Sequence, residues 1–199
     1  MLTRTWPWTA DPGYKVSVTN PTDSELVAAS LAGNRDAFGL LVERHQRHVY
    51  QLCYRFVGNH EDASDLAQDV FIRAFRSLKT FKGDAALGTW LYRIAVNVSL
   101  NKVSVKSSKA EPLDVLLRTN DLRVVADAES ASDAVLRHER AGQVRAAIAR
   151  LPKKQRATLI LRMYHELPHE QIAGILGSSV GAVKANFFHA LNNLKKLLS

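Results

Sequence analysis

The sequence contains one cysteine among 199 residues, so a disulfide framework within the chain is excluded. Cys53 falls on the apolar side of a helical pattern, which predicts a thiol in the core. No apolar run approaches the roughly 20 residues that span a bilayer, and residues 1–15 lack the apolar segment of a secretory signal. Sustained alternation of apolar and polar residues is also absent, so no sheet is expected. These absences predict a cytoplasmic, all-α protein without stable membrane insertion.

Acidic residues are scarce in the last third of the chain, which makes the charge distribution one-sided. Residues 136–199 carry 11 Lys or Arg and 3 Asp or Glu, whereas residues 1–135 carry 16 of each kind. The whole net charge of +8 therefore lies in the C-terminal segment. Because Lys and Arg neutralise DNA phosphates, this distribution favours a segment that binds nucleic acid over a merely solvated surface.

Helical periodicity starts at Asp23 and predicts two helical domains joined by a linker. The first 21 residues mix Pro, Gly, Thr and Trp without periodicity, which predicts a flexible arm. The segment KVSVKSSKAEP after Asn101 is polar and ends in proline, which is typical of a linker. We expect an all-α fold of two small domains with these divisions: a flexible arm over 1–21, a first domain over 22–102, a flexible linker over 103–133 and a second domain over 134–199.

Four helices are expected in the first domain. A short helix should end at Gly33, a long one should end at Gly58, and the fourth should begin with Thr89 as its cap. The third should turn six residues inward: Leu66, Val70, Phe71, Ala74, Phe75 and Leu78. The second domain should hold helices at about 134–150, 153–165, 169–176 and 179–198.

Three residues in the second domain have the spacing of a helix-turn-helix. Ala173 is small enough for the place where two helices touch, Gly177 tolerates a positive φ at the turn, and Val183 provides an apolar anchor. Ser178 or Ser179 can cap the second helix, which such motifs lay in the major groove of DNA. An ordinary helical hairpin is the alternative interpretation of this spacing, and the basic surroundings favour DNA binding.

The third expected helix carries acids at its start and cations at its end, an order that the helix dipole favours. The acids are Glu61, Asp62, Asp65 and Asp69, and the cations are Arg73, Arg76 and Lys79. Aromatic and polar residues surround the following loop: Phe81, Lys82, Gly83, Asp84, Trp90, Tyr92, Arg93 and Asn97. This mixture suits stacking on unpaired bases, and burial of the aromatic rings in a core is the alternative interpretation.

Two blocks of the sequence closely resemble regions of a known family. The strings DLAQDVFIRAFRSLKTFKGD and TWLYRIAVN resemble region two of bacterial RNA polymerase sigma factors of the extracytoplasmic-function (ECF) group, within the sigma-70 family. The string LPKKQRATLILRMYHELPHEQIAGILGSSVGAVKANFFHAL resembles their region four. The likeness covers about residues 23–101 and 134–198, and the two blocks follow one another in the family's order.

The resemblance implies a protein that is not an enzyme and that needs no metal or other cofactor. Core RNA polymerase would hold the chain through its β′ clamp helices and β flap and would carry out all the chemistry. The chain would direct polymerase to promoter DNA by recognising the −10 and −35 elements. An anti-sigma factor is the inhibitor that the family leads us to expect.

The resemblance also implies roles for individual positions. For docking on polymerase it implies Asp62, Asp65, Gln68, Asp69, Phe71 and Arg73. For recognition and melting of the −10 element it implies Phe81, Lys82, Gly83, Asp84, Trp90, Arg93 and Asn97. For the −35 element it implies Arg156, Arg162, Ser179, Lys184, Asn186, Phe188 and His189, with the two arginines as phosphate contacts.

The recognition helix departs from the family's usual pattern. Where the family commonly has G-T-V-[KR]-S-R, this chain has GAVKAN over 181–186, and the usual H-R-A-R or F-R-A-R becomes FHAL over 188–191. Each lost bidentate arginine contact shifts base discrimination by ~1–3 kcal/mol. We therefore expect an unusual −35 preference or weaker −35 binding. Leu87 and Gly88, where larger residues are common, and a thinned basic tail after Asn101 leave the −10 specificity open.

Two other functions compete with this interpretation. A stand-alone helix-turn-helix repressor or activator would bind duplex DNA unaided, usually as a dimer on palindromic half-sites. A helical enzyme with a DNA-binding tail would need a catalytic constellation, which the sequence does not indicate. His165 and His169 have a metal-ligand spacing, but Pro168 should interrupt the helix between them and no further ligand completes a site.

Overall fold

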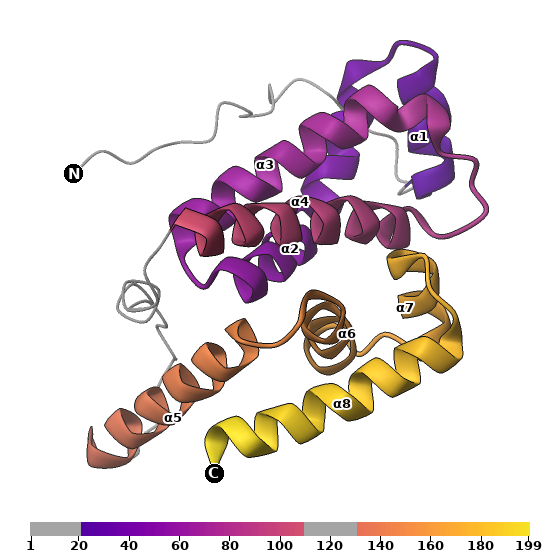
Figure 1. Ribbon diagram of the computed structural model, residues 1–199. Coiled ribbons are helices and arrows are strands. Elements are labelled where there is room, and N and C mark those ends of the chain that lie inside the picture. The colour runs from indigo at the N-terminus through magenta and orange to yellow at the C-terminus, as the bar shows by residue number, and fades with distance from the viewer. Residues whose placement is uncertain (1–20, 110–130) are drawn as a thin grey trace.

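A computed structural model describes the backbone of residues 21–109 and 131–199. Within these ranges all regular structure is helical, as predicted, and the helices form two modules that pack on each other (Figure 1). The N-terminal module contains α1 (Asp23–Leu31), α2 (Arg35–Val57), α3 (His60–Ser77), the 3-10 helix η1 (Leu78–Thr80) and α4 (Leu87–Lys109). The C-terminal module contains α5 (Ala131–Ala149), α6 (Lys153–Tyr164), α7 (His169–Leu176) and α8 (Val180–Leu198).

Short polar side chains begin the first helices. The Thr22 hydroxyl accepts a hydrogen bond from the Glu25 amide at 3.3 Å, and the Glu25 carboxylate accepts one from the Thr22 amide at 2.7 Å. Asn34 and Asn59 cap α2 and α3 with their side-chain oxygens. Gly58 ends α2 in the left-handed region at φ 76°, which glycine adopts without steric cost. Local sequence signals therefore fix the tight turn between α2 and α3.

Helix α4 begins earlier than the sequence analysis predicts. Its first residue is Leu87, and Thr89 lies inside the helix instead of capping it. The carbonyl of Ala86 accepts hydrogen bonds from the Thr89 and Trp90 amides at 3.0 and 3.2 Å, so the helical pattern starts before the threonine. The prediction that Thr89 caps the helix is therefore wrong, and α4 begins within one turn before it.

The two helices that flank the linker extend into the range assigned to it. α4 continues to Lys109, and an ion pair of 3.2 Å between Lys102 and Asp62 holds its second half against the start of α3. α5 begins at Ala131, three residues before the expected position. The predicted arm and the middle of the predicted linker, 110–130, lie outside the described residues.

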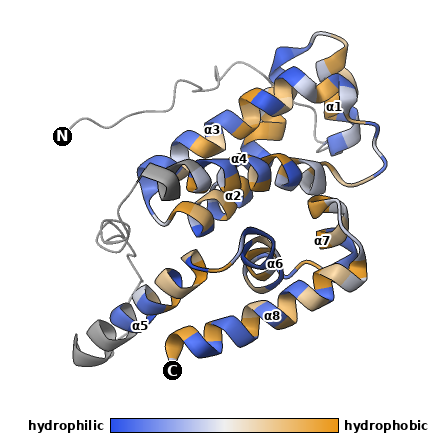
Figure 2. Ribbon diagram, viewed as in Figure 1, coloured by the Kyte–Doolittle hydropathy of each residue, from blue (hydrophilic) through white to orange (hydrophobic). Residues whose placement is uncertain are grey.

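The core of the N-terminal module lies between α2, α3 and α4. Leu52, Cys53, Phe56 and Val70 are at most 1% exposed. Burial raises the pKa of the Cys53 thiol to about 11, so the thiol is protonated and unreactive at neutral pH. The predicted core thiol is confirmed. Figure 2 shows hydrophobic and hydrophilic residues alternating along the helices of both modules, as expected of helices that bury one face.

Helices α7 and α8 form the predicted helix-turn-helix. Ala173 and Val183 are buried where the two helices meet, and Gly177 turns the chain between them at φ 57°. Ser179 is the serine that caps α8, because its hydroxyl accepts a hydrogen bond from the Ala182 amide at 3.2 Å. The three spacing positions therefore have the structural roles that the motif predicts.

Replacing Gly177 with alanine should destabilise the C-terminal module by about 1–2 kcal/mol, because the new Cβ must occupy the left-handed region. No atom lies within 4 Å of that Cβ position, so backbone strain alone causes the loss. Gly174 is the matched control, since its surroundings are equally open but it lies inside α7. Gly174→Ala should stabilise the fold by about 0.5–1 kcal/mol. Urea unfolding measures both variants, and a shift of the same sign for the two would contradict this account of the turn.

Candidate functional surfaces

The outward side of α3 carries the polar residues that the sequence analysis assigned to polymerase docking. Asp65 and Gln68 are exposed and make no hydrogen bond or ion pair within the described ranges. The Arg73 Nε donates to both carboxylate oxygens of Asp69 at 3.0 Å, an ion pair one helical turn apart. The outward side of α3 therefore carries two polar side chains that are available for contacts, Asp65 and Gln68, and one ion pair, Asp69–Arg73.

Two of the residues assigned to docking have different surroundings. Phe71 is 9% exposed and its side chain packs in the hydrophobic core, so it does not form part of the outward side of α3. Asp62 accepts a hydrogen bond from the Asn59 side chain at 2.7 Å and pairs with Lys102 of α4. Asp62 therefore ties the start of α3 to α4.

Two hydrophobic residues on α3 are exposed, although the sequence analysis did not predict either of them at the surface. Ile72 is 42% exposed and lies one turn after Gln68, in line with Asp65. Phe75, which periodicity placed inward, is 49% exposed and touches Phe38 of α2 edge-on, with ring centroids 4.9 Å apart. A helix has room for only one buried stripe, and Val70 and Ala74 fill it. We call Asp65, Gln68, Asp69, Ile72 and Phe75 the α3 face.

The loop after η1 brings together part of the set assigned to the −10 element. Phe81 packs on Trp90 of α4 with ring centroids 5.4 Å apart, and both rings are half-buried. Lys82 and Asp84 are exposed, and Gly83 adopts φ 79°, which turns the loop between them. The structure thus places two charged side chains around a ring pair at the edge of the N-terminal module.

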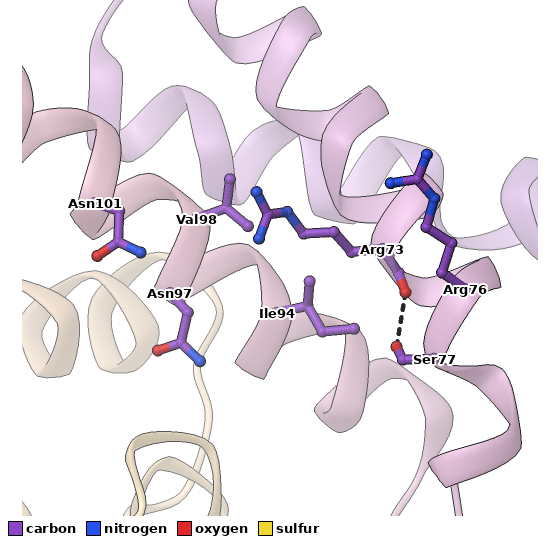
Figure 3. Close-up of a pocket in the computed structure, with 7 residues that line it drawn as sticks. All are labelled: Arg73, Arg76, Ser77, Ile94, Asn97, Val98 and Asn101. Atoms are coloured by element: carbon purple, nitrogen blue, oxygen red, sulfur yellow. Dashed lines mark hydrogen bonds between the residues drawn. The ribbon is translucent and has the colours of Figure 1, made fainter.

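A hollow of about 380 Å³ lies between α3 and α4. Figure 3 shows its lining, with Arg73 and Arg76 on α3 and Asn97 and Asn101 on α4; the full set is Arg73, Arg76, Ser77, Ile94, Asn97, Val98 and Asn101. Asn97 lies two turns after Trp90, on the same side of α4. Arg93 is exposed on α4 but does not line the hollow. Guanidinium and amide groups there offer donors for phosphates and base edges.

The recognition helix α8 exposes three of the residues assigned to the −35 element. Lys184, Phe188 and His189 are exposed, and the rings of Phe188 and His189 lie 5.9 Å apart. Asn186 is half-buried, and Ser179 is occupied as the cap of the helix. The assigned residues that remain exposed on α8 are therefore a cation and two rings.

The two arginines assigned to phosphate contacts are engaged inside the protein. Arg156 is 6% exposed, and its guanidinium donates hydrogen bonds to the carbonyls of Phe56 and Ala149. Burial lowers the pKa of Arg156 to about 10, so it stays charged at neutral pH. Arg162 donates to the Leu167 carbonyl at 3.1 Å and thereby holds the turn before α7. In this arrangement Arg156 cannot reach DNA, and Arg162 has a structural role.

Arg156 is part of a contact between the two modules that we call the seam. It is formed by α2 and α4 on one side and by α6, the turn after α6 and α7 on the other. The side chains that make its hydrogen bonds and ring contacts are Arg55, Phe56, Tyr92, Arg156, Tyr164 and His165. The Arg55 guanidinium lies 4.0 Å from the centre of the Tyr164 ring. The Tyr92 hydroxyl lies 3.2 Å from Nδ1 of His165. Each contact joins a residue of the N-terminal module to one of the C-terminal module.

His165 has a structural place in the seam. Burial, and then the neighbouring charges of His48 and Arg55, lower the pKa of His165 to about 4, so its ring is neutral at pH 7. His165 follows the end of α6 and His169 opens α7, so the two do not share a continuous helix. No group of three possible metal ligands occurs in the described part of the chain. Nor is any helix in that part long and apolar enough to cross a membrane.

Comparison with known proteins agrees with the two-module arrangement. The family model described as Sigma-70 region 2 matches residues 41–108, and the model described as Sigma-70, region 4 matches residues 141–194. The RNA polymerase sigma-H factor of Pseudomonas aeruginosa is 35% identical over 185 residues, which cover 91% of this chain and 96% of that protein. The ECF RNA polymerase sigma factor SigW of Bacillus subtilis is 35% identical over 170 residues, 83% of this chain and 91% of SigW.

A solved structure extends the similarity to three dimensions. CnrH in complex with the cytosolic domain of CnrY is 26% identical, with a TM-score of 0.62 over 88% of this chain and 96% of CnrH. Both family regions thus occur in order on one chain, and relatives at about 35% identity match nearly its whole length. The chain therefore belongs to the ECF group of the sigma-70 family of bacterial RNA polymerase sigma factors.

Proposed function

We propose that this chain binds core RNA polymerase and directs transcription initiation at promoters with matching −10 and −35 elements. The observation that carries the proposal is the separation of two surfaces on one chain: the α3 face with the α3–α4 hollow on one module, and the helix-turn-helix on the other. Polymerase carries out the chemistry, and the chain itself has no catalytic role.

The α3 face is the docking surface for the polymerase β′ clamp helices. Asp65 and Gln68 supply exposed polar groups, and Ile72 supplies apolar area in their midst. A hydrophobic residue surrounded by polar groups is the usual composition of an interface that excludes water at its centre. The second module contacts the polymerase β flap and the −35 element in our proposal.

The loop after η1 and the α3–α4 hollow hold the melted −10 strand. Phe81 and Trp90 provide rings on which an unpaired base can stack, and Lys82 attracts the backbone. Asn97 in the hollow can hydrogen-bond a base edge, with Arg73 and Arg76 beside it for phosphates. Capture of the single strand stabilises the open promoter.

An anti-sigma factor is the regulatory partner that we propose for this chain. Support comes from CnrH, whose structure contains the cytosolic domain of CnrY and resembles this chain over most of its length. Such a partner would have to cover the α3 face, the recognition helix or both, because these surfaces are needed for polymerase and promoter.

The seam must open before the chain can act on a promoter. The −10 and −35 elements are separated by about 25 base pairs, which is about 85 Å of duplex at 3.4 Å per step. In the seam, Tyr92 and His165 lie within 3.2 Å of each other, so the two modules are in contact. The 21 residues of 110–130 can reach at most about 70 Å when fully extended, and the modules themselves cover the rest. Binding to polymerase therefore separates modules that are packed together in the free chain.

Gel filtration with core polymerase, followed by transcription from a genomic template library, tests the proposed function. A sigma factor elutes with polymerase and yields transcripts from a small set of promoters that share spaced −10 and −35 elements. A tight symmetric dimer on a palindromic operator without polymerase would instead establish the competing repressor or activator function.

The double variant Asp65→Lys, Gln68→Ala should weaken binding to core polymerase about 30-fold, the effect of losing a hot-spot contact of about 2 kcal/mol. Both residues are exposed, so the unfolding midpoint should stay unchanged. Glu43→Lys makes the same charge change at an exposed position on α2 and should leave the affinity within twofold. Fluorescence titration with core polymerase measures all three proteins. Retained affinity in the double variant would contradict the assignment of the α3 face.

Arg55→Ala should favour the open chain, because it removes the guanidinium that lies over the Tyr164 ring. Loss of a cation–π contact worth about 0.5–1 kcal/mol raises the fraction of open chain, and so the apparent affinity for core polymerase, by about twofold to fivefold. Arg47→Ala, on the same helix and equally exposed, is the control because Arg47 makes no ion pair within the described ranges. Weaker binding of the Arg55 variant would show that the seam does not compete with polymerase.

A further inference from the structure

The outward centre of the recognition helix is apolar. Val183 and Ala190 are fully buried and define the inner side of α8. With 100° between successive residues, Gly181, Ala185 and Phe188 lie on the opposite side, and all three are exposed. Phe188 is 62% exposed, more than any other large hydrophobic residue in the described part of the chain. A ring so exposed contributes little to the core of this protein and is available for an external contact.

The shape of this side of α8 allows a close approach to the major groove. Gly181 and Ala185 are the smallest residues available, and a Cβ added to Gly181 would meet no atom within 4 Å. Helix-turn-helix motifs use this N-terminal part of the second helix to contact base edges. Because two small residues precede it on the same side, Phe188 is the bulkiest group that would enter the groove.

The side chains of α8 favour duplex DNA as the binding partner. They also limit the types of base contact that the helix can make. The helix contains no Asp, Glu or Arg, and its cations are Lys184, Lys195 and Lys196. Lys184 and Lys195 stand one and two turns from Phe188, where they can meet the phosphates on the rim of the groove. The bidentate arginine contact to guanine is absent, whereas Phe and Ala are side chains that contact the C5-methyl group of thymine.

We propose that Phe188, together with Ala185, recognises thymine C5-methyl groups in the major groove of the −35 element. The inference rests on the proposed sigma-factor function and deepens it by naming how the −35 element is selected. Specificity then comes from apolar contact, with lysines supplying phosphate binding that is independent of sequence. The chain therefore selects thymine at the position under Phe188, where an arginine would select guanine.

The test uses the complete chain bound to core polymerase and promoter duplexes selected from a library randomised in the −35 element. Each selected thymine is then replaced singly by deoxyuridine, which removes only the methyl group. At the position under Phe188 this replacement should weaken promoter binding about fourfold, the effect of one methyl group that loses its apolar contact.

Three variants identify the residue that touches the methyl group. Phe188→Ala should weaken binding to the thymine promoter and abolish the further effect of deoxyuridine at that position, because the two changes remove the same contact. When the promoter selection is repeated with Phe188→Arg, the selected promoters should have guanine in place of thymine at that position. Leu198→Ala removes a similarly exposed apolar residue at the far end of α8 and should keep the full deoxyuridine effect.

Binding that is insensitive to every deoxyuridine replacement, or equally sensitive with Phe188→Ala, would overturn the inference while promoter-specific transcription still supports the sigma-factor function. Loss of transcription on all templates with Phe188→Ala, without any effect of deoxyuridine, would also overturn it and would assign Phe188 to a protein contact. Failure of the unmodified chain to join core polymerase would remove the proposed function and this inference together.

Discussion

The buried charge of Arg156 is the interaction on which the arrangement of the two modules depends. An unpaired guanidinium in the interior is costly, and no carboxylate accompanies it in the described part of the chain. Its hydrogen bonds go to the carbonyls of Phe56 and Ala149, which lie in the last turns of α2 and α5 and have no partner within their own helices. The negative ends of two helix dipoles therefore surround the charge. Arg156 caps α2 of one module and α5 of the other.

The other polar contacts of the seam are individually weak. The remaining polar contacts of the seam are a stack of Arg55 on Tyr164 and a hydrogen bond between Tyr92 and the neutral ring of His165, and α4 also packs on α7. Each polar contact contributes about 1 kcal/mol, so a partner that binds only the open chain can shift the equilibrium. We propose core polymerase as such a partner, because the promoter elements that it positions lie about 85 Å apart. In this proposal the contact between the modules limits the access of the free chain to a promoter.

Capping residues and turn glycines predicted most of the fold. The exposure of individual side chains was harder to predict, for one physical reason. Capping residues, Gly58 and Gly177 act within a few residues of themselves, so their effects are readable from the sequence. Exposure is different, because it depends on which helix packs against which side. The family resemblance placed Phe71 and Arg156 at binding surfaces, and in this packed arrangement both are buried, so their assignments stay untested predictions. Packing exposes Phe75, which periodicity had turned inward. The assignments of Asp65 and Lys184 to binding surfaces remain predictions, and the structure leaves both side chains exposed.

The distance between the modules, before and after binding to polymerase, tests the central claim most directly. Spin labels on cysteines introduced at Gln46 of α2 and Asn192 of α8, both exposed, report this distance, while the buried thiol of Cys53 stays unlabelled. The account predicts one short distance in the free chain and an increase of tens of ångströms, of the order of the 85 Å promoter spacing, when core polymerase is added. An unchanged distance in the complex with polymerase would contradict it.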